Sequence, residues 1–264
     1  MQATITASGN QDMVSPLDIA AQAIGAMKTY GSGSTMVRAL DGVDIAFPSG
    51  RFTAVMGPSG SGKSTLMHCL AGLDNLTEGR IMIGDQDLSA MSERELTILR
   101  RQAVGFVFQA FNLVPTLTAR ENIELPLSMA GQRCDEAWLN TVVSAVGLGD
   151  RLHHTPNELS GGQQQRVAVC RALVSRPAII FADEPTGNLD SNTGAEILAF
   201  MRNAVDAMAQ TIVMVTHDAV AASYADEVIF LADGRIVDRL QAPTPSSVLD
   251  RIRNLTGGEQ ADVR

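Results

Sequence analysis

Residues 57–65 constrain this 264-residue chain more than any other stretch, because they match the phosphate-binding pattern G-x-x-x-x-G-K-[ST] at every fixed position. The apolar residues 52–56 before them predict a buried strand, and the apolar spacing after them predicts a helix. Glycines let backbone N–H groups turn inward, and the helix N-terminus adds free donors and a partial positive charge. A glycine-rich turn without a ligand does not explain the complete pattern. The predicted nucleotide-binding loop comprises Gly57, Pro58, Ser59, Gly60, Ser61, Gly62, Lys63, Ser64 and Thr65.

Two side chains of this loop are expected to act on a nucleoside triphosphate directly. In proteins with such a loop, the lysine reaches the β- and γ-phosphates, which assigns that role to Lys63. The hydroxyl group that follows the lysine ligates Mg²⁺, which makes Ser64 a predicted metal ligand.

A second motif is an apolar strand at residues 179–182 that ends in two carboxylates, Asp183 and Glu184. In proteins with a phosphate loop the strand-end acid holds Mg²⁺, usually through water, and Asp183 has this position. Glu184 lies one residue further on, where it could polarise a water in line with the γ-phosphate. A solvated acidic loop after a core strand is the alternative, and the phosphate loop upstream disfavours it.

The third motif, L-S-G-G-Q-Q-Q-R at residues 159–166, opens a predicted helix. Ser160 and Gln163 form a capping box, but this does not explain Gly161 and Gly162, which weaken a helix by roughly 1 kcal/mol each relative to alanine. Because a helix N-terminus is an anion site, glycines there fit a ligand that approaches the backbone closely. The sequence therefore predicts a second phosphate-binding helix terminus.

The order of strands and helices predicts an α/β domain with a mainly parallel sheet and helices on both faces. We expect a flexible N-terminal arm at residues 1–22, an ATPase domain at 23–242, and a short helix with a polar tail at 243–264. A mainly helical insertion is expected at about 110–160, and its first helix, capped by Thr118, is expected to be interrupted at Pro126.

Charge and hydropathy exclude some functions. A net charge of −9 argues against nonspecific nucleic-acid binding. No apolar run approaches the roughly 18 residues that cross a bilayer, and the first residues lack the features of a signal peptide. We therefore expect a cytoplasmic protein that reaches a membrane through a partner. Cys69, Cys134 and Cys170 are far apart, which predicts buried thiols rather than a zinc site.

The three motifs together resemble the ATP-binding subunit of an ATP-binding cassette (ABC) transporter over about residues 23–240. The resemblance implies a P-loop NTPase (RecA-like) core with an N-terminal antiparallel β subdomain and an inserted α-helical subdomain. It also implies a head-to-tail homodimer that hydrolyses ATP with Mg²⁺. Each ATP would lie between the phosphate loop of one copy and Ser160, Gly161, Gly162 and Gln163 of the other.

Further residues match motifs of this family. Tyr30 resembles the aromatic residue that stacks on adenine. Gln109 resembles the glutamine that contacts Mg²⁺ and reports the nucleotide state to the membrane partner. Asp190 ends a loop that resembles the one crossing between the two sites, and His217 resembles the histidine that contacts the γ-phosphate. The resemblance thus implies Lys63, Glu184 and His217 as catalytic residues.

Residues 71–74, 108–115, 121–122 and 185–190 resemble the group of the macrolide exporter (MacB), lipoprotein-releasing (LolD) and cell-division (FtsE) ATPases. In that group the ATPase acts on permeases with few transmembrane helices and a large extracytoplasmic region, and motion rather than solute is thought to cross the membrane. This implies an FtsX/MacB-like permease, expected as a separate chain, and a location at the cytoplasmic face of the membrane.

Three alternatives remain at this stage. An FtsE-like regulator would control an extracytoplasmic hydrolase without transport. A soluble ABC ATPase would act on DNA or ribosomes, although the single cassette and the acidic net charge argue against it. An importer ATPase is the third alternative, although many sugar importers carry a regulatory domain after the core. The substrate and the direction of transport stay open.

Overall fold

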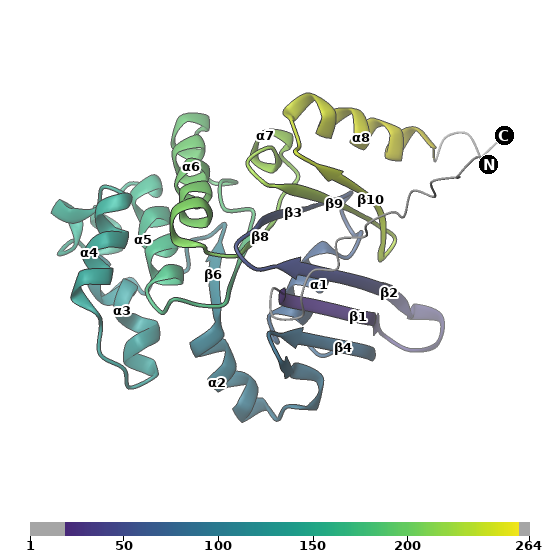
Figure 1. Ribbon diagram of the computed structural model, residues 1–264, viewed down its shortest axis with the longest axis horizontal. Coiled ribbons are helices and arrows are strands. Elements are labelled where there is room, and N and C mark those ends of the chain that lie inside the picture. The colour runs from purple at the N-terminus through teal and green to yellow at the C-terminus, as the bar shows by residue number, and fades with distance from the viewer. Residues whose placement is uncertain (1–18, 259–264) are drawn as a thin grey trace, which may run out of the picture.

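The structure of the protein is a computed structural model that describes residues 19–258 (Figure 1). Its strands are β1 Ile19–Tyr30, β2 Val37–Pro48, β3 Phe52–Met56, β4 Glu78–Ile83, β5 Gln86–Asp87, β6 Val104–Phe108, β7 Ile179–Asp183, β8 Ile212–Val215, β9 Glu227–Ala232 and β10 Arg235–Gln241. Its α-helices are α1 Lys63–Leu70, α2 Glu93–Ala103, α3 Ala119–Met129, α4 Glu136–Ala145, α5 Gly161–Leu173, α6 Ser191–Met208, α7 Ala219–Ala222 and α8 Pro245–Gly258.

The central sheet has six strands in the order β10-β9-β3-β8-β7-β6. All neighbours in it are parallel except β10, which pairs with β9 in antiparallel register. Parallel strands place their carboxyl ends at one edge, and the segments after β3, β6, β7 and β8 meet there. The predicted mainly parallel sheet and the hairpin at its end are confirmed.

Alternate side chains of this sheet enter two separate cores, as the period of two in a strand requires. Val55 of β3 and Phe181 of β7 pack with α1 and the antiparallel sheet, which has the order β2-β1-β4-β5. Ala54 and Ala182, one position away, pack on the other face with α3, α5 and α6. Helix α1 thus lies between the two sheets, and the helical region covers the opposite face (Figure 1).

The structure differs from the prediction at the start of the domain. Strand β1 begins at Ile19, so residues 19–22 belong to the antiparallel sheet and not to a flexible arm. The small side chains of Ala20 and Ala21 are buried, which explains why a hydrophobic pattern did not reveal this part of the strand. The rest of the predicted arm lies outside the described residues.

The predicted interruption of the helix at Pro126 is wrong, because α3 continues through it to Met129. A proline inside a helix costs about 3 kcal/mol through the lost hydrogen bond and the ring's contact with the preceding turn. Ile123 and Leu127 are buried in the core on either side of it, and each such burial contributes about 1.5–3 kcal/mol. Packing therefore offsets the local penalty.

Helix α8, the cysteines and the hydropathy of the helices complete the comparison with the predicted features. Helix α8 is longer than the short helix predicted near residues 248–252, and its Val248 is fully buried. Cys69 and Cys170 are buried as predicted, whereas Cys134 is only half-buried. No helix within residues 19–258 is both long enough and apolar enough to cross a bilayer.

Candidate nucleotide site

The phosphate loop, residues 57–65, joins β3 to α1 between the two sheets. Gly57 has φ 152° and Gly62 has φ 101°, values that L side chains rarely adopt. A Cβ atom at Gly57 would lie 2.0 Å from the carbonyl oxygen of Leu231, and one at Gly62 would lie 2.2 Å from that of Ala39. Backbone atoms of both sheets therefore lie directly against the loop, and only glycine fits at these two positions.

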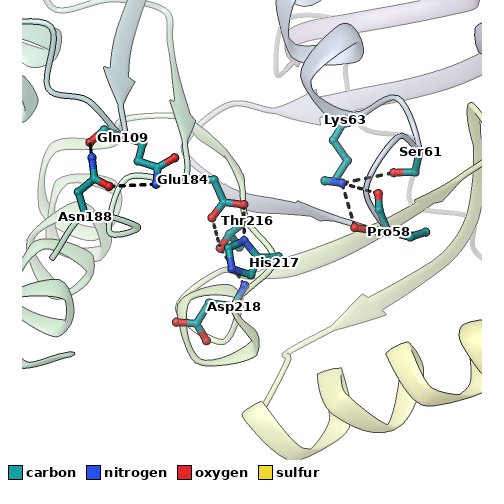
Figure 2. Close-up of polar contacts among 10 residues, drawn as sticks. Pro58, Ser61, Lys63, Gln109, Glu184, Asn188, Thr216, His217 and Asp218 are labelled. Atoms are coloured by element: carbon teal, nitrogen blue, oxygen red, sulfur yellow. Dashed lines mark hydrogen bonds and ion pairs between the residues drawn. The ribbon is translucent and has the colours of Figure 1, made fainter. Parts of the chain in front are cut away.

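The Lys63 side chain folds over the loop that precedes it (Figure 2). Its Nζ donates to the carbonyl oxygens of Gly57 at 2.9 Å and of Pro58 at 2.7 Å. Burial lowers the pKa of Lys63, and the nearby carboxylates Glu184 and Asp183 oppose this effect. The loop thus holds a half-buried cation beside its backbone N–H groups, an arrangement that favours a polyphosphate.

Asp183 ends β7 at the same edge of the sheet. Burial raises the pKa of its carboxyl group, the neighbouring Glu184 raises it further, and His68 and Lys63 act in the opposite direction. Residues 19–258 contain no cluster of three or more His, Cys, Asp or Glu side chains that could hold a metal ion. The single strand-end carboxylate of Asp183 is a donor suited to Mg²⁺ bound with a nucleotide, since that ion takes one or two carboxylates together with substrate phosphates.

Replacing Asp183 by asparagine should stabilise the nucleotide-free protein. Because its folded-state pKa is raised, the ionised carboxylate disfavours folding above that pKa, and a neutral amide removes the cost. The midpoint of thermal unfolding at neutral pH should rise by about 2–4 °C for each kcal/mol regained. Calorimetry as a function of pH measures this; the gain should disappear below the ordinary pKa of about 3.9, where the carboxyl is protonated in both states. A lower unfolding midpoint of Asp183→Asn at neutral pH would contradict a raised pKa of Asp183.

Glu184 follows Asp183 in the left-handed region, with φ 46°. Its backbone N–H donates to the carbonyl oxygen of Val215 at 2.9 Å, which ties it to the end of β8. Its carboxylate lies 2.7 Å from His217 Nδ1 and accepts a hydrogen bond from Thr216 Oγ1 at 3.3 Å. The His217 side chain is 79% exposed, so this pair faces the open side of the site (Figure 2). A carboxylate oriented in this way can accept a proton from water.

Gln109, which follows β6, forms two hydrogen bonds with Asn188 (Figure 2). Gln109 Nε2 donates to Asn188 Oδ1 at 3.2 Å, and Asn188 Nδ2 donates to the Gln109 carbonyl oxygen at 2.9 Å. Two residues further along, Asp190 caps α6 by accepting from the N–H groups of Asn192 and Thr193. Its interaction with the Thr193 side chain, together with these backbone bonds, lowers the pKa of Asp190. The loop before α6 is therefore attached to the segment after β6.

Tyr30 lies at the end of β1, and its ring is 42% exposed. Its hydroxyl donates to Asp74 Oδ2 at 2.6 Å, and Lys28 Nζ lies 4.8 Å from the ring centroid. Burial and the Asp74 carboxylate raise the pKa of Tyr30, and the side chain of Thr65, at the start of α1, acts in the opposite direction. The structure thus places an exposed aromatic ring beside the phosphate loop.

The predicted second phosphate site lies elsewhere in the molecule. Ser160 and Gln163 form the predicted capping box and bond to each other. A Cβ atom at Gly162 would lie 2.3 Å from Thr193 Cγ2 of α6, so the Thr193 side chain packs against this glycine and would have to move for any larger residue. The sequence does not reveal this contact. Figure 1 places α5 in the helical region and α1 between the sheets. One copy therefore brings Lys63, Gln109, Asp183, Glu184 and His217 to one edge of the sheet, which we call the catalytic edge. Residues 160–163 lie apart from the phosphate loop and next to the loop before α6, where a Cβ atom at Gly161 would lie 3.7 Å from Leu189.

The sequence did not predict the contacts of Asn188, Thr216 and Asp74, which bond to Gln109, Glu184 and Tyr30 respectively. Thr216 could have been noticed from its place between β8 and His217. Asn188 and Asp74 lie in stretches that match the family group, but they are distant in sequence from their partners, and no local pattern predicts these contacts.

An α/β core with this loop and these strand-end carboxylates defines a P-loop nucleoside triphosphatase. The family model described as ABC transporter matches residues 40–187, and the chain belongs to this family as one of its ATP-binding ATPases.

Comparisons with individual proteins lead to the same family. An uncharacterised ABC transporter ATP-binding protein of Thermotoga maritima is 48% identical over 211 residues, 79% of this chain and 90% of that protein. The macrolide export ATP-binding/permease protein MacB of Marinobacter nauticus is 45% identical over 222 residues, 83% of this chain but 34% of that protein. A solved dimeric structure of the ATP-binding cassette MJ0796 of Methanocaldococcus jannaschii, bound to ADP and phosphate, has a TM-score of 0.76 and 40% identity, covering 85% of this chain and 99% of that one.

Proposed function

We propose that two copies of this ATPase close head to tail around two ATP molecules, and that hydrolysis reopens them to move a membrane permease of the MacB/FtsX-like kind. The proposal rests on one observation: the residues predicted to bind ATP lie in two separate regions of one copy. The phosphate loop and residues 160–163 lie in different parts of one copy (Figure 1), so in the proposed arrangement a second copy completes each site. The dimeric form of the similar MJ0796 cassette supports this arrangement.

In this proposal each residue of the site binds ATP, stabilises charge or activates water. Lys63 and the loop amides bind the phosphates, and Ser64, Asp183 and Gln109 hold Mg²⁺, which neutralises negative charge on the transferred phosphoryl group. Glu184 positions and deprotonates the attacking water, and His217 orients that carboxylate and contacts the γ-phosphate. Tyr30 supports the adenine, and Asp190 holds the loop that meets the partner copy. Ser160, Gly161, Gly162 and Gln163 bind the ATP held by the partner.

A groove supports the permease as the partner. The groove, with a volume of about 410 Å³, lies between α2, β6 and α3, with Pro126 and Met129 on its apolar side. Arg100, Arg101 and Arg171 also line it. Each of them donates to a backbone carbonyl oxygen, and in the described part of the chain none of the three is paired with a carboxylate. An amphipathic cytoplasmic helix with acidic side chains fits such a groove. The curated MacB relatives, whose names include a permease, support this class of partner.

Capture from native membranes tests the proposal. Glu184→Gln protein held closed with ATP should retain a permease with few transmembrane helices and a large external domain, enriched at least about tenfold over the same protein without ATP. The double variant Glu184→Gln with Arg101→Glu is the matched control, because it reverses one charge in the groove, and it should capture less. Recovery of ribosomes or DNA without a membrane protein would contradict the proposal. A many-helix channel would indicate an importer, and a permease bound to a cell-wall hydrolase would indicate an FtsE-like regulator.

A further inference from the structure

Gln165 lies on α5, five residues after Ser160, and its side chain is fully buried. Its Nε2 donates two hydrogen bonds to backbone carbonyl oxygens, one to Phe108 at 3.3 Å and a short one to Pro185. Its Oε1 is buried and has no hydrogen-bond partner among residues 19–258. One amide therefore joins α5 to the segments that follow β6 and β7.

Packing alone does not explain an amide at this position. A buried polar atom without a hydrogen bond costs about 1–3 kcal/mol, and a methionine of similar volume would avoid that cost. Of the polar atoms in this side chain, Nε2 forms the hydrogen bonds, as a donor to two backbone carbonyl oxygens. We therefore look for the role of Gln165 in the position of these two carbonyl groups.

The first carbonyl group belongs to Pro185, directly after Glu184. A non-glycine residue with positive φ is strained and persists only where its neighbours hold it in place. The N–H of Glu184 donates to the carbonyl oxygen of Val215, and Gln165 donates to the carbonyl oxygen of the next residue, Pro185. The backbone on both sides of this carboxylate is therefore fixed by other elements.

The second carbonyl group belongs to Phe108, which shares its peptide unit with Gln109. Phe111 and Asn112, just beyond, also have positive φ, at 59° and 51°. Arg171, on the same helix as Gln165, donates to the carbonyl oxygens of both, at 2.8 Å and 2.6 Å. Helix α5 thus holds the segment of residues 108–112 at two points.

We propose that Gln165 is a positioning residue for ATP hydrolysis, which fixes Glu184 and Gln109 relative to α5, the helix whose N-terminus carries Ser160. Displacement of α5 on dimer closure then changes the position of the carboxylate that activates water. The inference rests on the proposed role of Glu184, and it adds a direct link within one copy between the partner-facing residues and the catalytic edge.

Gln165→Met removes both donors at similar volume, and kcat for ATP should fall at least about tenfold because a small misplacement of the catalytic group is costly. The KM for ATP should change less than about twofold, since the hydrogen bonds of Gln165 are to Phe108 and Pro185, outside the phosphate loop. Gln210→Met is the matched control: Gln210 is also buried and its Nε2 donates to the carbonyl oxygens of Pro177 and Thr211, at the opposite edge of the sheet. It should lower the unfolding midpoint similarly and leave kcat within about twofold.

A second variant separates hydrogen bonding from packing. In Gln165→Glu, the protonated acid restores one O–H donor, and burial favours the protonated form. The kcat of Gln165→Glu relative to the unsubstituted protein should rise severalfold between about pH 8 and about pH 6, whereas the ratio for Gln165→Met should stay flat. Equal pH dependence of the two ratios would overturn the donor role.

The outcomes distinguish this inference from the proposed function. Unchanged kcat in Gln165→Met, or an equal loss in Gln210→Met, overturns the positioning role. If Glu184→Gln hydrolyses ATP normally, the proposed catalytic role of Glu184 fails first. An inactive Glu184→Gln with an active Gln165→Met overturns the positioning role alone.

Discussion

Glu184→Gln should bind ATP with an affinity within about threefold of the unsubstituted protein and hydrolyse it at least about 100-fold more slowly, the range expected for loss of a general base. The amide has the same shape as the carboxylate and can still interact with His217 and Thr216, so the geometry at the end of β8 is retained. It cannot accept a proton from water. Single-turnover hydrolysis and equilibrium binding of ATP measure the two quantities separately.

The matched control is Glu95→Gln. Glu95 is an exposed carboxylate whose bonds are to Ser92, in the capping box that begins α2, and its substitution should leave turnover within about twofold. Near-normal hydrolysis by Glu184→Gln would remove this residue from the catalytic role. Loss of ATP binding together with hydrolysis would instead indicate a role in nucleotide affinity.

The sequence predicted the elements of the catalytic edge well, because each of its motifs directly follows a strand of the parallel sheet. Lys63, Gln109, Glu184 and His217 all come within a few residues of a strand end, and the topology of parallel strands brings these ends together. Local patterns of apolar residues, glycines and caps were sufficient for this. Most strands and helices followed from the same patterns, although β1 begins earlier and α8 is longer than predicted.

Contacts between distant segments could not be predicted in this way. The pairing of Gln109 with Asn188, the packing of Gly162 against Thr193, and the bonds of Gln165 depend on how helices and loops sit on the finished core. A glutamine in the run Q-Q-Q has no local feature that distinguishes a buried residue from an exposed one. The failure at Pro126 has the same origin, since burial in the tertiary structure outweighed a local penalty.

Ser160→Arg should reduce ATP hydrolysis at least about 100-fold and leave ATP binding to the phosphate loop intact, because Ser160 and Lys63 belong to different parts of one copy. The substitution also removes the cap of α5, at a cost of about 0.5–2 kcal/mol, so loss of activity alone would not separate a missing contact from a weakened helix. An experiment that mixes two inactive variants distinguishes the missing contact from the weakened helix.

Ser160→Arg mixed with Glu184→Gln should regain activity. In a head-to-tail dimer of one copy of each, the first site has both changes, and the second combines an intact catalytic edge with intact residues 160–163. At equal amounts about half of the dimers are mixed, and each has one working site of two, so about a quarter of the original activity should return. The control replaces Glu184→Gln by the double variant carrying both changes, which leaves no intact site in any dimer and should restore nothing. Sites completed within a single copy would give no recovery in either mixture, since each variant lacks a group that its own site needs.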